Sequence, residues 1–208
     1  MNKYIVEFVG TFFLVLTIGL TVVGGGAGVI PPLAIGAALM VMIFAGGHVS
    51  GGHFNPAVTL AVWMRGRCDT KDVAPYWASQ VIGAGLAAAA VKYLRAGAVV
   101  SPMIPAVGPA LLAELLFTFA LAWMVLNVAT AKATAGNSFY GLAIGMTVMT
   151  GAFAVGDISG GVFNPAVAIG ISLLGLSSWG NLWIYLAANF LGGAAAALVF
   201  KVVHPEDV

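Results

Sequence analysis

The sequence predicts an all-α integral membrane protein with six transmembrane helices and two re-entrant half-helices, arranged as an inverted internal repeat. Three observations support this: an apolar composition, six long apolar stretches and an internal duplication. Of the 208 residues, 61% are hydrophobic and 7% are charged, and the mean hydropathy is +1.05. A soluble domain has about 45–50% apolar and about 25% charged residues. So few ionic side chains cannot solvate a globular surface, which excludes a soluble domain.

The charge and the cysteine content exclude two further classes. A net charge of +1 gives no field that would attract a polyanion, so nucleic acid is not an expected partner. Cys68 is the single cysteine and cannot form an internal disulfide, which excludes a disulfide-stapled secreted scaffold.

Six apolar stretches are long enough to cross a bilayer, which takes about 20 residues. The first follows Lys3, as a signal peptide would, but it is about 20 residues long, includes Glu7 and lacks a convincing cleavage site, which favours a membrane helix. The six predicted spans are 4–24, 32–48, 73–95, 109–130, 139–156 and 179–202.

Two further segments, around 50–65 and 159–175, are moderately apolar but too short to cross. At about 1.5 Å per residue, ten helical residues reach about halfway through a membrane. Such pieces enter a bilayer only where they are buried in protein or line a watery cavity. They are therefore predicted to be re-entrant segments.

The chain repeats itself at an offset of 109 residues. Residues 33–58 and 142–167 are identical at 16 of 26 positions, including an ungapped SGG-x-FNPAV. Glu7-x-x-x-Thr11 is echoed by Glu114-x-x-x-Thr118 at an offset of 107. Each half has three spans, an odd number, so the second half enters the membrane from the opposite side. We therefore expect one channel domain over 1–208, with repeats at about 1–100 and 105–208.

The duplicated Asn-Pro-Ala is predicted to begin a half-helix near the bilayer midplane. Asparagine is a favoured N-cap, and proline suits the first helical turn. One copy alone would be read as an ordinary helix cap, but two symmetric copies at membrane depth indicate a pore. The half-helices are expected at about 55–64 and 164–174, starting with Asn55, Pro56 and Ala57 and with Asn164, Pro165 and Ala166.

Two helix N-termini that face a narrow passage, each with roughly +0.5 of an elementary charge, raise a barrier to cations. The asparagine amides can donate to a passing oxygen. The glycines before each motif are expected to let the chain run extended and expose carbonyl acceptors. The predicted pore-lining carbonyls are those of Gly51, Gly52, His53, Gly160 and Val162.

With its two Asn-Pro-Ala boxes, GHVSGGHFNPAVT and a glutamate in each of helices 1 and 4, the whole chain resembles the aquaporin (major intrinsic protein) family. The resemblance implies one pore per subunit and a homotetramer. It also favours a structural role for Glu7 and Glu114 as acceptors for the re-entrant loops. The alternative is a proton relay, because carboxylates inside membrane helices are costly and usually functional.

Most members of the family narrow the outer pore with four residues, the last an arginine directly after the second Asn-Pro-Ala. The matching positions here are Ile35, Ala152, Gly161 and Val167, so the arginine is absent. Aromatic and histidine side chains usual at the first two positions are absent too. The resemblance therefore implies a widened, apolar selectivity filter.

The leading hypothesis is a passive channel for water and small uncharged solutes such as glycerol, urea or ammonia. A secondary transporter built from inverted repeats and a structural membrane protein with a non-conducting pore are the alternatives. No nucleophile–base or metal constellation appears, so neither an enzyme nor a cofactor is expected. His48 and His53 have no third ligand near them in sequence and predict no metal site.

Basic residues predict the orientation, because cytoplasmic loops are enriched in them. We expect a multi-pass protein of the cell (plasma or inner) membrane, surrounded by lipid, with both termini in the cytoplasm. In this orientation six basic residues lie on the cytoplasmic side, and two, Lys92 and Arg95, lie outside. Asp157 is expected at the outer end of helix 5, where it either shapes the outer loop or makes the mouth acidic. The six inner residues are Lys3, Arg65, Arg67, Lys71, Lys132 and Lys201.

Overall fold

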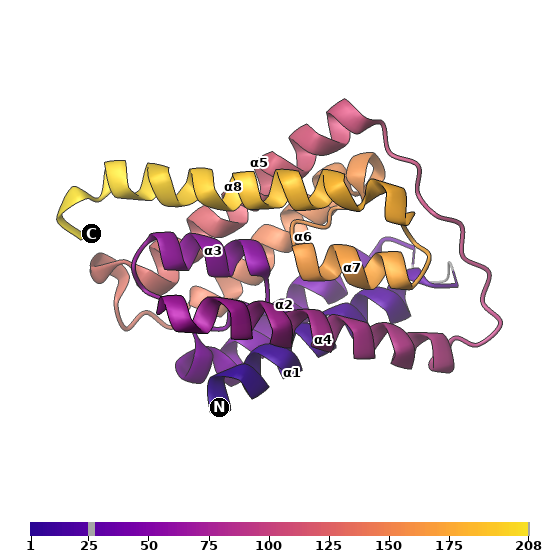
Figure 1. Ribbon diagram of the computed structural model, residues 1–208, viewed down its shortest axis with the longest axis horizontal. Coiled ribbons are helices and arrows are strands. Elements are labelled where there is room, and N and C mark those ends of the chain that lie inside the picture. Colours follow the sequence, from indigo (N-terminus) through magenta and orange to yellow (C-terminus); the bar gives the residue numbers. More distant parts are fainter. Residues whose placement is uncertain (25–27, 208) are drawn as a thin grey trace.

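The computed structural model describes residues 1–24 and 28–207, and within these ranges the fold is helical (Figure 1). Six α-helices are long, and two α-helices of nine residues follow the second and the fifth of them. The long helices are α1 (Asn2–Val22), α2 (Ile30–Ser50), α4 (Thr70–Leu94), α5 (Val107–Val125), α6 (Tyr140–Ser159) and α8 (Leu182–Val203). The short helices are α3 (Pro56–Met64) and α7 (Pro165–Leu173).

These helices correspond to the six predicted spans and two half-helices, with ends that differ by a few residues. The span predicted at 109–130 is α5 followed by a π-helical turn, Leu126–Thr130. Five of the long helices are apolar and long enough to cross a membrane. The sixth, α4, has 25 residues but carries Lys71, Asp72 and Lys92 near its ends.

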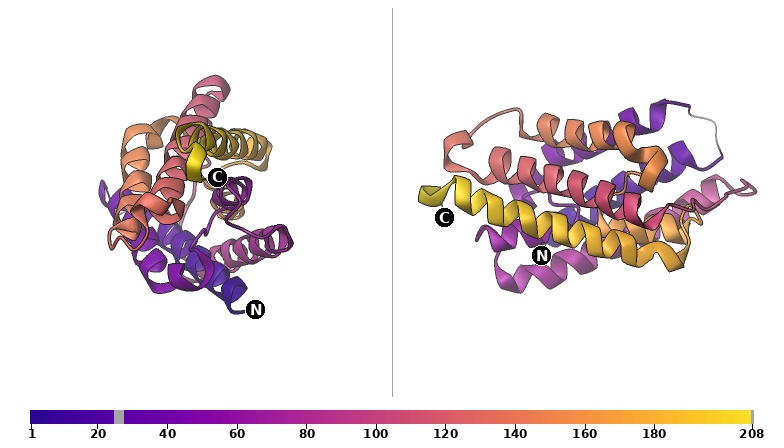
Figure 2. Two further views of the ribbon diagram at one scale, coloured as in Figure 1. Left: turned by 90° about the vertical axis from the view of Figure 1, so that its left-hand side faces the viewer. Right: turned by 90° about the horizontal axis from the view of Figure 1, so that it is seen from above.

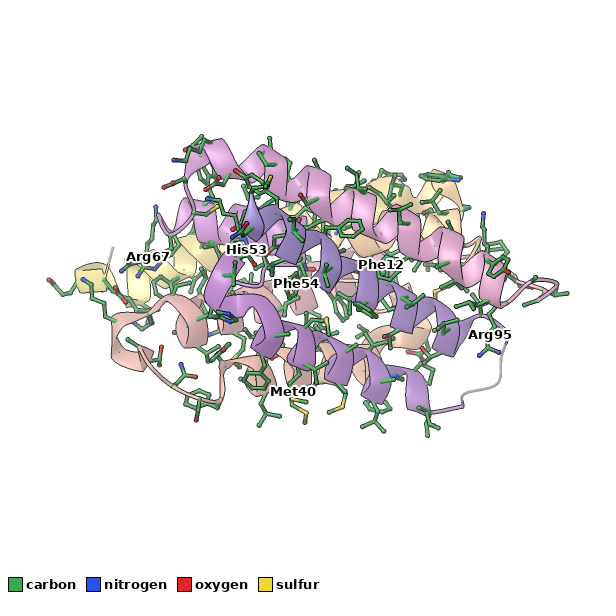
Figure 3. The ribbon with its side chains drawn as sticks, turned by 90° about the horizontal axis from the view of Figure 1, so that it is seen from below. Phe12, Met40, His53, Phe54, Arg67 and Arg95 are labelled. Carbon is green, nitrogen blue, oxygen red and sulfur yellow. The ribbon has the colours of Figure 1, made fainter. Side chains whose placement is uncertain are left out.

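The six long helices form two groups of three that pack against each other. Helix α1 packs on α2 and α4, and α5 packs on α6 and α8, while α2 and α6 join the groups. Figure 2 shows the helices running along one common direction. The terminal side is our name for the side at which α1 begins and α8 ends, and the distal side is the opposite one. Arg67 lies at the terminal side and Arg95 at the distal side (Figure 3).

Glycines at equivalent positions of the two repeats permit the closest helix crossings. A Cβ atom on Gly36 would lie 2.7 Å from the carbonyl oxygen of Gly145, and one on Gly145 would lie 2.4 Å from that of Gly36. Gly83 and Gly192 bring α4 against α1 and α8 against α5 in the same way, with backbone atoms at 2.6 Å. Because these contacts lie within one chain, the structure explains these glycines without contacts between subunits.

Each half-helix packs mainly against a long helix of the other repeat. Helix α3 lies along α8, and α7 lies along α4 (Figure 1). The contact on α8 is tight, because a Cβ atom on Gly193 would lie 2.6 Å from the carbonyl oxygen of Ala57. The N-termini of α3 and α7 consequently point at each other in the middle of the molecule.

Candidate pore and its two re-entrant loops

The first re-entrant loop is anchored on Glu7, a fully buried carboxylate of α1. Its Oε1 atom accepts from the Ser50 hydroxyl at 2.7 Å and the His53 backbone N–H at 2.9 Å. Its Oε2 atom accepts from the Phe54 N–H at 2.6 Å and the Gln80 side chain at 2.8 Å. Each oxygen therefore has two donors. This is the arrangement expected of a structural acceptor for the loop.

Glu114 of α5 anchors the second loop with the same geometry. It accepts from the Ser159 hydroxyl at 2.7 Å, from the backbone N–H groups of Val162 and Phe163 at 2.9 and 2.7 Å, and from Asn189 at 2.9 Å. Buried backbone N–H groups outside regular structure need such partners, since an unpaired one costs about 1–3 kcal/mol.

The glycines of the two loops do not run extended, contrary to the sequence-based expectation. Gly51 ends α2 in the left-handed region at φ 89°, and Gly160 ends α6 at φ 93°. The chain turns sharply at these positions because it must leave a long helix and reverse within a few residues. Phe54 and Phe163 also have positive φ, 48° and 49°, which is strained for residues with a side chain.

The phenylalanine rings help to hold this strained backbone. A Cβ atom on Gly10 would lie 2.2 Å from the Phe54 ring, and one on Gly151 would lie 2.6 Å from the Phe163 ring. Each ring is 1% exposed and fills the space left by a glycine of a neighbouring helix. The loop conformation is therefore fixed by packing as well as by the carboxylates.

The two Asn-Pro-Ala boxes meet and exchange hydrogen bonds. The Asn55 Oδ1 atom caps α3 by accepting from the Ala57 N–H at 2.9 Å, and its Nδ2 donates to the carbonyl of Phe163 at 2.8 Å. Asn164 caps α7 in the same way, and its Nδ2 donates to the carbonyl of Phe54 at 2.9 Å. An amide has two N–H donors, so each asparagine keeps one for the pore.

A cavity of about 510 Å³ runs from this asparagine pair to the distal side. Most of its wall is apolar and comes from α1, α2, α5 and α6. The four residues expected in the filter, Ile35, Ala152, Gly161 and Val167, all line it. Of the residues expected to supply pore carbonyls, Gly52, His53, Gly160 and Val162 line it as well.

A second cavity, of about 810 Å³, opens at the terminal side. Gly51 lines this terminal cavity instead of the pore cavity, which departs from the expected set of carbonyls. His48 lies on its wall, and Asp157 lies at the equivalent place in the pore cavity. Among the described residues Asp157 is exposed and has no hydrogen-bond or ion-pair partner.

Sequence reasoning missed the polar residues that hold the loops from behind. Tyr76 donates to the carbonyl of Ser50 at 2.7 Å, and Tyr185 donates to that of Ser159 at 3.0 Å. Gln80 and Asn189 support the two glutamates. Each of these pairs is separated by 109 residues, so extending the repeat comparison into α4 and α8 would have found them.

Ionic contacts gather at the terminal side. Arg65, which ends α3, is buried, stacks over the Phe200 ring at 4.7 Å and pairs with Asp207 at 2.8 Å. Asp207 also accepts the Lys132 backbone N–H at 2.7 Å. This hydrogen bond and the nearby Arg65 charge hold the Asp207 pKa below its usual range. Within residues 1–24 and 28–207, no group of three potential metal ligands occurs.

Six long helices, two opposed half-helices and a polar pair at their meeting point define a membrane channel built from two inverted repeats. A family model described as "Major intrinsic protein" matches residues 1–200. The chain belongs to this family and is a passive channel for water and small solutes, not an enzyme.

Relatives and a solved structure agree with this assignment. The chain is 38% identical over 217 residues to glycerol uptake facilitator protein-like 6 of Lactiplantibacillus plantarum, with full coverage of both. It is 36% identical to aquaporin NIP1-3 of Oryza sativa subsp. japonica, with coverage of 99% of this chain and 75% of that protein. An X-ray structure of the aquaglyceroporin from Plasmodium falciparum shares the fold, with a TM-score of 0.82, 22% identity and coverage of 99% and 97%.

Proposed function

We propose that this channel passes small uncharged solutes such as glycerol, urea or ammonia together with water, through a wide and apolar distal filter. The observation that carries the proposal is the set of four filter positions on the pore cavity, Ile35, Ala152, Gly161 and Val167. None of them has a side-chain hydrogen-bond donor, whereas an arginine would add five donors and a fixed charge. The relative named as a glycerol uptake facilitator protein supports the same solute class.

Two effects of the missing arginine compete. A lost hydrogen bond leaves a passing water less well compensated, by about 0.5–1.5 kcal/mol. The added width removes a steric block on solutes larger than water, and steric barriers rise much more steeply than this. Width therefore dominates, and larger solutes pass.

Cations and hydronium are excluded by the two opposed half-helices. Pro56 and Pro165 begin helices whose N-termini face the asparagine pair, and each N-terminus carries roughly +0.5 of an elementary charge. This barrier does not depend on the filter arginine, so proton exclusion survives its loss.

Proteoliposomes and stopped-flow light scattering test the proposal with water, glycerol, urea and ammonia. We expect flux of at least one of these solutes above that of empty liposomes, unchanged by sodium or proton gradients. Flux of water alone would contradict the wide filter. Gradient-dependent uptake would favour the transporter, and no osmotic response would favour a structural protein.

The assembly is proposed to be a homotetramer in the cell membrane in which each chain, 1–208, forms one channel domain. The number four comes from the family, and native mass spectrometry in mild detergent tests it. Stable monomers or dimers would contradict it.

The terminal side is proposed to be cytoplasmic, because six of the eight basic residues lie near it. In a Cys68→Ser background, an impermeant maleimide added outside cells should label Val99→Cys and not Lys71→Cys. Both side chains are exposed, so access alone decides the result. The opposite labelling would reverse the orientation.

A further inference from the structure

The wall of the pore cavity carries a carboxylate at one place. Among the described residues that line this cavity, Asp157 of α6 is the only Asp, Glu, Lys or Arg. Its side chain is exposed, and the part of the chain that the structure describes gives it no hydrogen-bond or ion-pair partner. The arginine that the family resemblance leads one to expect is replaced by Val167. The charged side chain in the distal part of this pore is therefore negative instead of positive.

Helix α6 places Asp157 at the end of an apolar stripe. Side chains four positions apart lie on one face of a helix. Four such residues line the pore cavity, and none has a side chain that can hydrogen-bond a solute: Ile144, Val148, Ala152 and Gly156. Asp157 follows this stripe directly, so it is the first side chain of α6 toward the distal side that can accept a hydrogen bond inside the cavity.

The filter lies beside the same turns of α6. A Cβ atom on Gly161 would lie 3.1 Å from the Cα atom of Ala152 and 3.6 Å from the Cα atom of Gly156. Asp157 comes five residues after the filter residue Ala152, which is a rise of about 7.5 Å along a helix. A small solute together with one hydrogen bond of about 3 Å spans this rise. Its leading end can therefore enter the filter while its trailing end still contacts the carboxylate.

The stability of α6 does not explain an aspartate at this position. Asp157 lies in the last turn of the helix, where the aligned peptide dipoles leave a partial negative charge and an acidic side chain is unfavourable. The repeat-related residue is His48, in the last turn of α2, and it lines the terminal cavity. The two mouths of a repeated structure therefore present different groups, and only the distal one presents a carboxylate.

A carboxylate at this place recognises a particular arrangement of donors. Its two oxygens only accept, and they can accept two parallel hydrogen bonds at once, as they do from a guanidinium group. The two nitrogens of urea and the neighbouring hydroxyls of a vicinal diol present donors in such pairs. A solute that leaves water for an apolar filter loses hydrogen bonds, and the pair that it forms with the carboxylate offsets part of this loss.

We propose that Asp157 is a specificity-determining residue of this channel. Its carboxylate receives the paired donors of ureas and vicinal diols at the distal mouth, and it favours their entry over that of solutes of similar size with one donor group. The inference rests on the proposed wide filter and names the solute class that this filter favours. A cation that binds at the same place is stopped by the half-helix barrier, so guanidinium, the charged analogue of urea, should obstruct the mouth.

Urea and acetamide permeability of reconstituted variants tests the proposal, because the two solutes are similar in size and only urea has donors on two nitrogens. Asp157→Asn should lower the ratio of urea flux to acetamide flux about two- to tenfold, which is the effect of one lost hydrogen bond. Asp157→Glu keeps the carboxylate and should restore most of the ratio. His48→Asn is the matched control at the repeat-related position and should leave the ratio unchanged.

Water flux in the presence of guanidinium is a second readout, and it does not require a solute to pass the filter. Guanidinium chloride is present at equal concentration on both sides of the proteoliposomes, and a sucrose gradient drives water out. Compared with the same concentration of sodium chloride, guanidinium should slow water flux through the wild type and not through Asp157→Asn.

A ratio of urea to acetamide flux that stays constant in Asp157→Asn, or that falls equally in His48→Asn, would overturn the proposal. Failure of the wide filter is seen separately, as a wild-type protein that passes water but neither urea nor acetamide. In that case, slowing by guanidinium that requires Asp157 would still support the carboxylate as the group that receives paired donors. Equal slowing of the wild type and Asp157→Asn would overturn that role.

Discussion

Asn55 donates a hydrogen bond to the backbone carbonyl of Phe163, 108 positions later in the chain, at 2.8 Å. The same amide group caps α3 through its oxygen. One side chain thus begins the first half-helix, fixes the second loop and offers a donor to the pore. The contact explains why an asparagine is required where aspartate or serine would serve as a helix cap alone.

Asn55→Asp is therefore expected to let cations leak. The carboxylate keeps the cap but places a negative charge where two half-helix N-termini are positive, and it leaves the Phe163 carbonyl without its donor. Potassium flux in dye-loaded liposomes should rise severalfold. Asn164→Asp should do the same, whereas Asn181→Asp, which lies at the start of α8, should not.

Glu7→Gln should destabilise the protein without adding or removing volume. Whichever oxygen is replaced, the new amide nitrogen faces a backbone N–H, that of His53 or that of Phe54, which can only donate and so loses its acceptor. An orphaned buried donor costs about 1–3 kcal/mol, and each kcal/mol lowers Tm by about 2–4 °C in a chain of this size. Thermal unfolding in detergent measures the loss, with the exposed Glu206→Gln as control. An unchanged Tm would contradict the anchoring role.

Val167→Arg should reduce glycerol and urea flux more than water flux. The substitution returns a long, charged side chain to the filter, which narrows the passage and supplies donors for water. Val167→Leu adds bulk without donors and should lower all fluxes. The stopped-flow assay measures the ratio of glycerol to water flux. If that ratio stays at the wild-type value in Val167→Arg, the filter is not at this position.

The hydrogen bond from the Lys132 backbone N–H to Asp207, together with the nearby Arg65 charge, should make stability depend on pH in the acid range. The pKa of Asp207 is lowered in the folded protein, so its stabilising contribution is complete above the unfolded pKa of about 3.9. The contribution is lost as the pH falls through the lowered folded value. Asp207→Asn should lower Tm at neutral pH. Below a pH of about 4, the Tm of this variant should decrease less with falling pH than the Tm of the wild type.

Asp69→Asn is the control for this prediction, because Asp69 pairs with Lys71 at 3.4 Å on an exposed surface where ion pairs contribute little. Equal acid sensitivity in wild type and Asp207→Asn would show that Asp207 is not the titrating group.

Gly36→Ala should weaken the crossing of α2 and α6. The added Cβ would lie 2.7 Å from the carbonyl oxygen of Gly145, so the helices must separate. We expect a Tm several degrees lower and reduced water flux. Gly108→Ala is the matched control, since a Cβ there meets nothing within 4 Å and alanine is the better helix former. An equal decrease of Tm in Gly36→Ala and Gly108→Ala would contradict the role of Gly36 in the packing of α2 against α6.

The helices and the opposed half-helices could be predicted from the sequence because both depend on local signals. Apolar length gives the spans, and Asn-Pro gives the start of each half-helix. The family resemblance gave the four filter positions, all of which line the pore cavity.

The conformation of the two re-entrant loops could not be predicted. The left-handed turns at Gly51 and Gly160 follow from the reversal of the chain after a long helix, which is a tertiary constraint. The orientation of the His53 ring depends on Thr59 of α3, which is in turn held by Gln80 of α4. Such relations become visible only when the helices are placed.

Each half of the chain completes the other. The backbone carbonyls of Phe54 and Phe163 each accept a hydrogen bond from an asparagine of the opposite half. Each half-helix also lies against a long helix of the opposite half. The chain therefore resembles two homologous subunits that exchange elements with each other and are joined covalently. Residues 1–100 or 105–208 produced alone would therefore leave a half-helix without its partner surface and should not conduct. Co-expressed as separate fragments, they should reassemble into a working channel.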